Sequence, residues 1–172
     1  FFRHCCVHQA PLACEDSVWP VDPLHRSHLE GRCFLIAGSL SDPADLENFK
    51  RRDSAKSNFV NASETSKMSF TGIFGFGDSC QYVHSGVTLE GPSFTLQYNN
   101  LQKSCPDCMV IRFDSKSNEL KHFYLFNRQK EVEKKEMEEF KAQVECLNMP
   151  PPVVMDPTKD FCQEQIAPQA SR

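Results

Sequence analysis

The feature that most constrains the fold is one long amphipathic helix, which comes late in a chain of short strands. Between Glu131 and Leu147 the apolar residues recur three and four positions apart, so they form one stripe on a helix surface. Its members are Met137, Phe140, Val144 and Leu147. Charged residues, Glu136 among them, occupy the solvated face, and the prolines at 150–152 end the helix. Such a stripe must pack on one apolar surface, and a sheet closed into a barrel is the partner that we expect.

Upstream of this helix, apolar and polar residues alternate in short segments that Gly, Pro, Asn, Asp and Ser separate. The expected strands are 32–39, 55–62, 68–76, 80–89, 94–98, 109–114 and 120–127, with an extended tail at 153–155. Asp42 is a good N-cap, so a short helix or turn is expected directly after the first strand. Seven or eight strands with short connections predict an up-and-down meander, and an eight-stranded barrel of this kind can hold one small ligand.

The apolar rows of these strands indicate what such a barrel contains. The chain has 14 phenylalanines, and glycines at 72, 75 and 86 interrupt the rows and leave space in them. The pocket residues that the rows predict are Phe70, Phe74, Phe94, Leu96, Ile111 and Phe113. No Lys or Arg lies between Lys67 and Lys103, so the middle strands offer no cation, and Arg112 is expected to face solvent. The sequence therefore predicts a mostly apolar ligand.

Composition favours a secreted protein. Nine cysteines are many for a reducing compartment, and Asn61 begins a glycosylation sequon. A net charge of −4 argues against electrostatic binding of nucleic acid, and no apolar run approaches the length of a membrane span. The cluster of His and Cys at 4–8 has no second ligand group at zinc-site spacing, so we expect no metal and no cofactor.

The chain is expected to form one domain. Residues 14–164 would make up this domain, 1–13 a leader remnant or disordered arm, and 165–172 a polar tail.

Three segments carry a resemblance to the lipocalin family. Residues 29–39 resemble the first-strand motif of lipocalins, and residues 123–128 resemble the strand before the lipocalin helix. Residues 138–147 look like the helix of the branch that contains apolipoprotein M, alpha-1-acid glycoprotein and the fish toxin-binding proteins. The resemblance implies an all-β eight-stranded barrel with one C-terminal helix, secretion, a small hydrophobic ligand and association with lipoprotein particles. Further pocket positions are Val83, Ser85 and Phe126.

Two features of this sequence depart from the family pattern. Cys33 stands where lipocalins have a tryptophan at the barrel floor, whereas Arg128 matches the basic residue that accompanies it. Val83 and Ser85 stand about where apolipoprotein M reads a charged headgroup, so the site for sphingolipid phosphates does not carry over.

The resemblance also implies a disulfide framework. It pairs Cys14 with Cys146 and Cys80 with Cys162, a choice that spacing alone does not make. Cys105 and Cys108 are then left for a local bridge.

Four hypotheses for the function remain open at this point. The first is a non-enzymatic carrier of a hydrophobic molecule, and the second is a scavenger of toxins or xenobiotics. The third is a lipocalin isomerase that uses the thiol of Cys33, as prostaglandin D synthase uses a pocket cysteine. The fourth is a disulfide-stapled module with a filled barrel that binds a protein. Alkylation with an isomerase assay separates the enzyme from the carriers, and apolar fluorescent probes separate an open barrel from a filled one.

Overall fold

The computed structural model describes most of the expected domain. The described residues are 18–20, 30–61, 67–88, 95–99, 101, 104–117, 119–159 and 162–163. Several predictions lie outside them: the arm 1–13, the tail 165–172, Cys14, Phe94, and the side chains of Asn61, Ser85 and Leu96.

The elements follow the predicted order. They are β1 (Val18–Pro20), β2 (Gly31–Leu40), α1 (Pro43–Lys50), β3 (Ser54–Asn61), β4 (Lys67–Phe76), β5 (Ser79–Thr88), β6 (Thr95–Asn99), β7 (Cys108–Asp114), β8 (Leu120–Asn127), α3 (Lys134–Cys146) and β9 (Val153–Val154). Each expected strand is present with small changes at its ends, while the short β1 was not predicted. The late helix is shorter than the expected 131–147 because it begins after Glu133, its N-cap residue.

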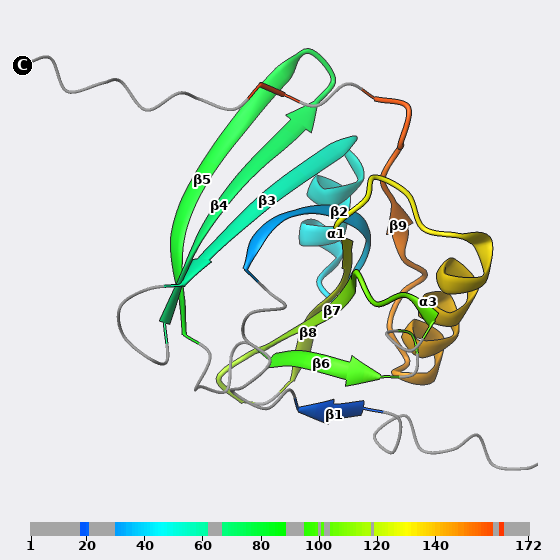
Figure 1. Ribbon diagram of the computed structural model, residues 1–172. Helices are drawn as coiled ribbons and strands as arrows, with labels where there is room; N and C mark the ends of the chain where they lie inside the picture. Colours follow the sequence, from blue (N-terminus) through cyan, green and yellow to red (C-terminus); the bar gives the residue numbers. More distant parts are fainter. Residues whose placement is uncertain are drawn as a thin grey trace, which may run out of the picture.

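All strands join one antiparallel sheet (Figure 1). Its order is β1-β6-β7-β8-β2-β3-β4-β5, and β9 pairs with β2 beside this path. Neighbours in sequence pair from β2 to β5 and from β6 to β8, as in an up-and-down meander. The eight-stranded closed barrel is not confirmed. In the described part of the chain the sheet has open ends at β1 and β5, and residues 89–94, which precede β6, are outside that part.

A bulge in β2 divides its apolar residues between two cores. The register of β2 against β8 shifts between Leu35 and Ala37, so the inward and outward rows change places there. Leu35 and Leu40 belong to a cluster inside the curved sheet. Ile36 and Ala37 belong to a second cluster, which packs under α3 on the outer face. Strand β2 thereby contributes apolar residues both to the interior of the sheet and to the outer surface on which α3 packs.

Helix α3 packs by the predicted stripe, and Figure 1 shows it beside β9 at one side of the sheet. Phe140 and Val144 are buried, and the Phe140 ring stacks on Phe123 of β8 with centroids 5.4 Å apart. The prediction that Glu136 faces solvent was wrong, because its side chain is buried. Glu136, Phe140 and Val144 are four residues apart and share one helix face, which explains the burial.

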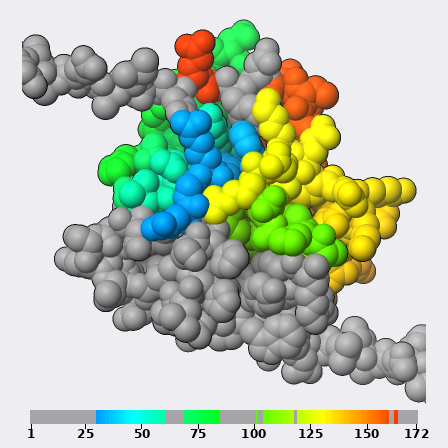
Figure 2. All heavy atoms as spheres, viewed as in Figure 1, coloured from blue at the N-terminus to red at the C-terminus, as the bar shows by residue number. Residues whose placement is uncertain are grey.

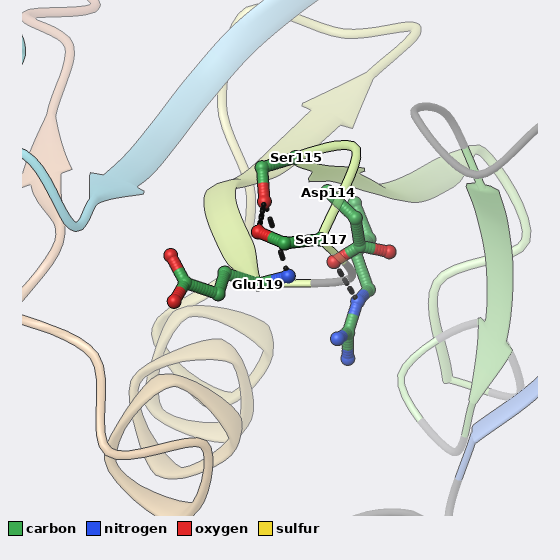
Figure 3. A network of polar contacts seen from close by, with 5 residues as sticks. Asp114, Ser115, Ser117 and Glu119 are labelled. Atoms are coloured by element: carbon green, nitrogen blue, oxygen red, sulfur yellow. Dashed lines mark hydrogen bonds and ion pairs between the residues drawn. The ribbon is translucent and has the colours of Figure 1, made fainter.

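The two ends of the sheet differ, and we call them the mouth and the floor. At the mouth lie α1 and the turns β4–β5 and β7–β8; the Asp42 carboxylate caps α1 by accepting from the backbone N–H of Ala44 at 2.8 Å. Figure 3 shows the β7–β8 turn, where Ser115 Oγ lies 2.9 Å from Ser117 Oγ and accepts from the Glu119 N–H at 3.2 Å.

At the floor, Arg128 donates from Nη1 to the Arg32 carbonyl at 2.9 Å. Figure 2 shows the start of β2, in blue, against the yellow segment that follows β8.

The described segment that follows α3 is attached to the sheet. Cys162 forms a disulfide with Cys80 of β5, and Tyr82 donates its hydroxyl to the Gln163 carbonyl at 2.8 Å. Met155 N–H donates to the Ile36 carbonyl at 2.9 Å. The bridge closes a loop of 82 residues, which restricts the unfolded chain and stabilises the fold.

Candidate functional site

A cavity of about 320 Å³ lies inside the curved sheet. Its lining residues are Leu35, Arg52, Ser57, Phe59, Phe70, Phe74, Val83, Ile111, Phe113, His122, Tyr124 and Phe126. Most of them are aromatic or aliphatic, and they come from β2, β3, β4, β5, β7 and β8. Cavities that hold small molecules have volumes of about 300–1,000 Å³ and similar apolar linings. The size fits one small molecule.

Alternate residues of β8 form an aromatic row along this cavity. His122, Tyr124 and Phe126 follow one another at every second position, which places them on one face of the strand. Centroids are 5.6 Å apart for His122 and Tyr124, and 6.0 Å apart for Tyr124 and Phe126. Phe113 on the neighbouring strand meets Tyr124 edge-on at 5.7 Å. At the floor end, Phe126 meets Phe59 edge-on at 6.2 Å.

Two glycines make room for these rings. A Cβ atom on Gly72 would lie 2.6 Å from the Phe74 Cζ and 3.0 Å from the Phe70 Cζ. A Cβ on Gly38 would lie 2.6 Å from the Tyr124 Cδ1 and 2.8 Å from the Phe49 Cζ. The rings therefore lean over positions where only glycine fits without movement.

Six of the nine predicted pocket residues line the cavity. They are Phe70, Phe74, Val83, Ile111, Phe113 and Phe126. Ser85 lies in β5 opposite Phe70, and Leu96 lies in β6 opposite Ile111, but the structure describes neither side chain; Phe94 is outside the described residues. Sequence reasoning missed Leu35, Arg52, Ser57, Phe59, His122 and Tyr124. For His122 and Tyr124 a signal existed, because both share the inward row with Phe126.

A cation borders the cavity, but it comes from outside the middle strands. Arg52 lies in the short connection between α1 and β3, and its guanidinium carbon sits 3.8 Å from the centroid of the Phe74 ring. It also lies within 5.2 Å of the Phe49 centroid and 5.8 Å of the Phe76 centroid. Arg112, which was expected to face solvent, forms an ion pair with Asp114, with 2.7 Å between Nε and Oδ1.

A second cavity of about 410 Å³ opens at the mouth. It shares Arg52, His122 and Tyr124 with the inner cavity, so these three residues stand at the junction. Asp45 of α1 faces His122 with 3.7 Å between Oδ2 and Nε2. Burial lowers the pKa of His122, and the Asp45 charge offsets part of this shift. Burial likewise lowers the pKa of Arg52, but a guanidinium remains protonated in proteins.

Two hydroxyl groups accompany the arginine. Burial raises the pKa of Tyr124 to about 12, with the Arg52 charge acting against the shift, so the phenol keeps its proton at neutral pH. Ser57 is only 2% exposed and lines the inner cavity. Its Oγ has no hydrogen-bond partner among the described residues. Both hydroxyls add polar groups to the lining of the cavity.

Cys33 lies on the floor side of the interior as a buried free thiol. Burial raises its pKa to about 12, and the Arg128 charge lowers it only in part. The thiolate is the reactive form of cysteine, so this site is unsuited to nucleophilic catalysis at neutral pH. Cys33 also does not line the inner cavity. These observations speak against the thiol-dependent isomerase hypothesis.

Apart from Cys33, the cysteines in the part of the chain that the structure describes are disulfide-bonded. Cys105 and Cys108 form the local disulfide, and Cys146 is also disulfide-bonded, while its implied partner Cys14 is outside the described residues. The described side chains contain no group of three His, Cys, Asp or Glu arranged to hold a metal. Neither α1 nor α3 has the length and apolar character needed to cross a bilayer.

Comparisons with known proteins agree with this architecture. Residues 88–165 match the family model of the ApoM domain. The structure is similar to that of the siderocalin Ex-FABP, with a TM-score of 0.60 and 12% identity over 81% of this chain and 97% of that chain. It is similar to the siderocalin Q83 with a TM-score of 0.60 and 13% identity, over 83% and 97% of the two chains.

At these identities the two siderocalins bear on the fold alone. Comparison with curated protein sequences finds no match. Residues 88–165, which include β6 to β9 and α3, thus resemble the ApoM domain, and the sheet as a whole has a lipocalin-like fold.

Proposed function

We propose that the protein binds a small hydrophobic ligand inside the sheet and carries it outside the cell, without catalysing a reaction. The observation that carries the proposal is the inner cavity of about 320 Å³, which aromatic rings line while leaving it open. Burying about ten methylene groups of a ligand there would contribute on the order of 8 kcal/mol before the costs of association. The buried, protonated thiol of Cys33 supports the proposal that the protein catalyses no thiol-dependent reaction.

Secretion is supported by the disulfides Cys80–Cys162 and Cys105–Cys108, which persist in oxidising compartments. Glycosylation of Asn61 and association with lipoprotein particles belong to the same proposal and rest on the sequon and on the ApoM match. The pocket residues named above are proposed as the ligand contacts.

A titration with the neutral apolar fluorophore N-phenyl-1-naphthylamine tests the proposal. We expect saturable enhancement of fluorescence at one site per chain. Val83→Phe should abolish most of this binding, because Val83 lines the cavity and a larger side chain fills it. Val60→Phe is the matched control, since Val60 is a strand valine that is 50% exposed. No enhancement with the folded wild-type protein, or equal loss in both variants, would contradict a carrier function.

A further inference from the structure

The turn between β7 and β8 carries a sequence pattern that the carrier function does not use. Glu119 follows Ser117 by two positions, and no other serine of the chain has an acidic residue at that distance. Kinases that select acidic substrates bind such a side chain with basic groups in their substrate groove. The pattern makes Ser117 a candidate for phosphorylation, provided that the serine hydroxyl and the Glu119 carboxylate can both be reached.

Both groups are accessible in the folded protein. Ser117 is exposed, and the contact recorded for its Oγ is with Ser115 Oγ at 2.9 Å. The Glu119 side chain is 70% exposed, with the Lys121 Nζ 3.5 Å from its Oε2. In Figure 3 the Glu119 carboxylate points away from the two serine hydroxyls. An exposed ion pair such as that with Lys121 is weak, so the carboxylate stays available to a kinase.

Ser115, the other serine of this turn, is engaged in holding the turn together. Its Oγ accepts a hydrogen bond from the Glu119 N–H at 3.2 Å, and its own N–H donates to the Glu119 carbonyl at 2.8 Å. These bonds use the backbone of Glu119, whereas recognition by a kinase uses its side chain. A change of the Glu119 side chain therefore tests recognition and leaves both bonds of the turn in place.

The turn can open locally to enter a kinase groove. Lys116, Ser117 and Glu119 are exposed, and the pairing of β7 with β8 is irregular between Phe113 and Asp114. Exposed segments with few buried contacts open at low cost relative to the whole fold. Opening residues 115–119 therefore need not disturb the regular pairing that begins at Phe113.

We propose that Ser117 is a phosphorylation site for an acidophilic kinase of the secretory pathway that recognises Glu119. The Ser117 Oγ forms a bond to the γ-phosphorus of ATP, and the bond from that phosphorus to the bridging oxygen of ADP breaks. The hydroxyl proton passes to a carboxylate of the kinase, so the products are phosphoserine, ADP and a proton. The site goes beyond the proposed carrier function and shares with it only the passage through the secretory pathway.

The phosphate would lie at the mouth but outside the two cavities. No lining residue that the structure describes belongs to 115–119. A phosphoserine adds about 1.5 to 2 negative charges at pH 7 and three strong acceptor oxygens. The modification therefore changes the charge of the outer surface at the mouth without filling the interior. Binding of the neutral fluorophore N-phenyl-1-naphthylamine should stay within twofold.

The experiment incubates the purified protein with ATP and a secretory-pathway casein kinase that reads an acidic residue two positions after the serine. We expect intact-protein mass spectrometry to show the gain of one phosphate, about 80 Da, and fragmentation to place it on Ser117. Glu119→Gln removes the charge and keeps the size, so the initial rate should fall about tenfold or more, as for the loss of a hydrogen bond to a charged group.

Ser79→Ala is the matched control for Ser117→Ala. Ser79 is an exposed serine of the β4–β5 turn at the same end of the sheet, but Gln81 stands two positions after it. Ser117→Ala should abolish incorporation of phosphate, and Ser79→Ala should leave it unchanged. Thermal unfolding of each variant checks that a lost signal does not come from a lost fold.

Three results would overturn the proposal. The first is no phosphate on the folded wild-type protein under conditions in which the same kinase modifies casein. The second is phosphate on Ser79 or another serine in place of Ser117, and the third is an unchanged rate for Glu119→Gln. The fluorophore keeps this test separate from that of the carrier function. If the unmodified wild-type protein does not bind it, the carrier proposal fails; if it binds while Ser117 stays unmodified, only the phosphorylation proposal fails.

Discussion

Replacing Gly72 with alanine should weaken ligand binding more than it weakens the fold. The new methyl carbon would lie 2.6 Å from the Phe74 Cζ, closer than real contacts allow, and 3.0 Å from the Phe70 Cζ, which is a tight contact. Both rings line the open cavity, so they can yield by moving into it. The displaced rings would then reduce the volume of the cavity.

The magnitudes follow from these contacts. Overpacking costs about 1–3 kcal/mol, and a strand alanine recovers about 0.5–1 kcal/mol relative to glycine. Because the rings have space to move, we expect the free energy of unfolding to fall by no more than about 1 kcal/mol. If the displaced rings exclude one or two methylene groups of the ligand, at about 0.8 kcal/mol each, affinity falls about 4- to 15-fold.

Fluorophore titration and denaturant unfolding measure the two effects separately. Gly75→Ala is the matched control on the same strand, because the three atoms nearest to its Cβ would belong to Ser54 and Asp53 and not to the cavity rings. It should leave affinity within twofold. Unchanged affinity in a folded Gly72→Ala protein, or an equal loss in both variants, would refute the idea that these rings border the binding space.

Three further predictions concern the disulfide, the histidine at the mouth and the buried thiol. Replacing Cys80 and Cys162 together with alanine should lower the free energy of unfolding by about 4.5 kcal/mol, as loop entropy predicts for a separation of 82 residues, and a loss below 1 kcal/mol in denaturant titrations would contradict this. His122 has a folded pKa below its ordinary value of 6.5, so the unfolded chain takes up its proton first as the pH falls. Stability should therefore decline below about pH 6.5 until the folded histidine is also protonated, and His122→Gln should remove this component from unfolding curves recorded across that range. Cys33 should react with iodoacetamide only after unfolding, because burial raises its pKa to about 12, and rapid stoichiometric labelling detected by mass spectrometry of the native protein would show the opposite.

The strands and the outer helix could be predicted because each has a period that the sequence displays. Phe70 and Phe74 recur in an inward row of period two, and Phe140 and Val144 recur four residues apart on α3. This spacing of apolar residues arises whenever one face of a strand or helix is buried. It does not depend on which element covers that face.

Other features depend on contacts between distant segments, for which a single sequence gives no period. Arg52 follows a helix in a short connection, and its inward position is set by the Phe74 ring on β4. The bulge in β2 sends Ile36 and Ala37 to the same outer face, which an uninterrupted apolar run cannot indicate. Glu136 is polar by type but lies on the buried face of α3.

The most direct test of the central claim is a crystal structure of the protein grown with 12-bromododecanoic acid, with the bromine located by anomalous scattering. The open interior predicts a bromine peak between the sheet walls on the floor side, near Phe59 and Phe126. A peak only on the outer surface, or side chains that fill the interior and leave no bound chain, would contradict the account.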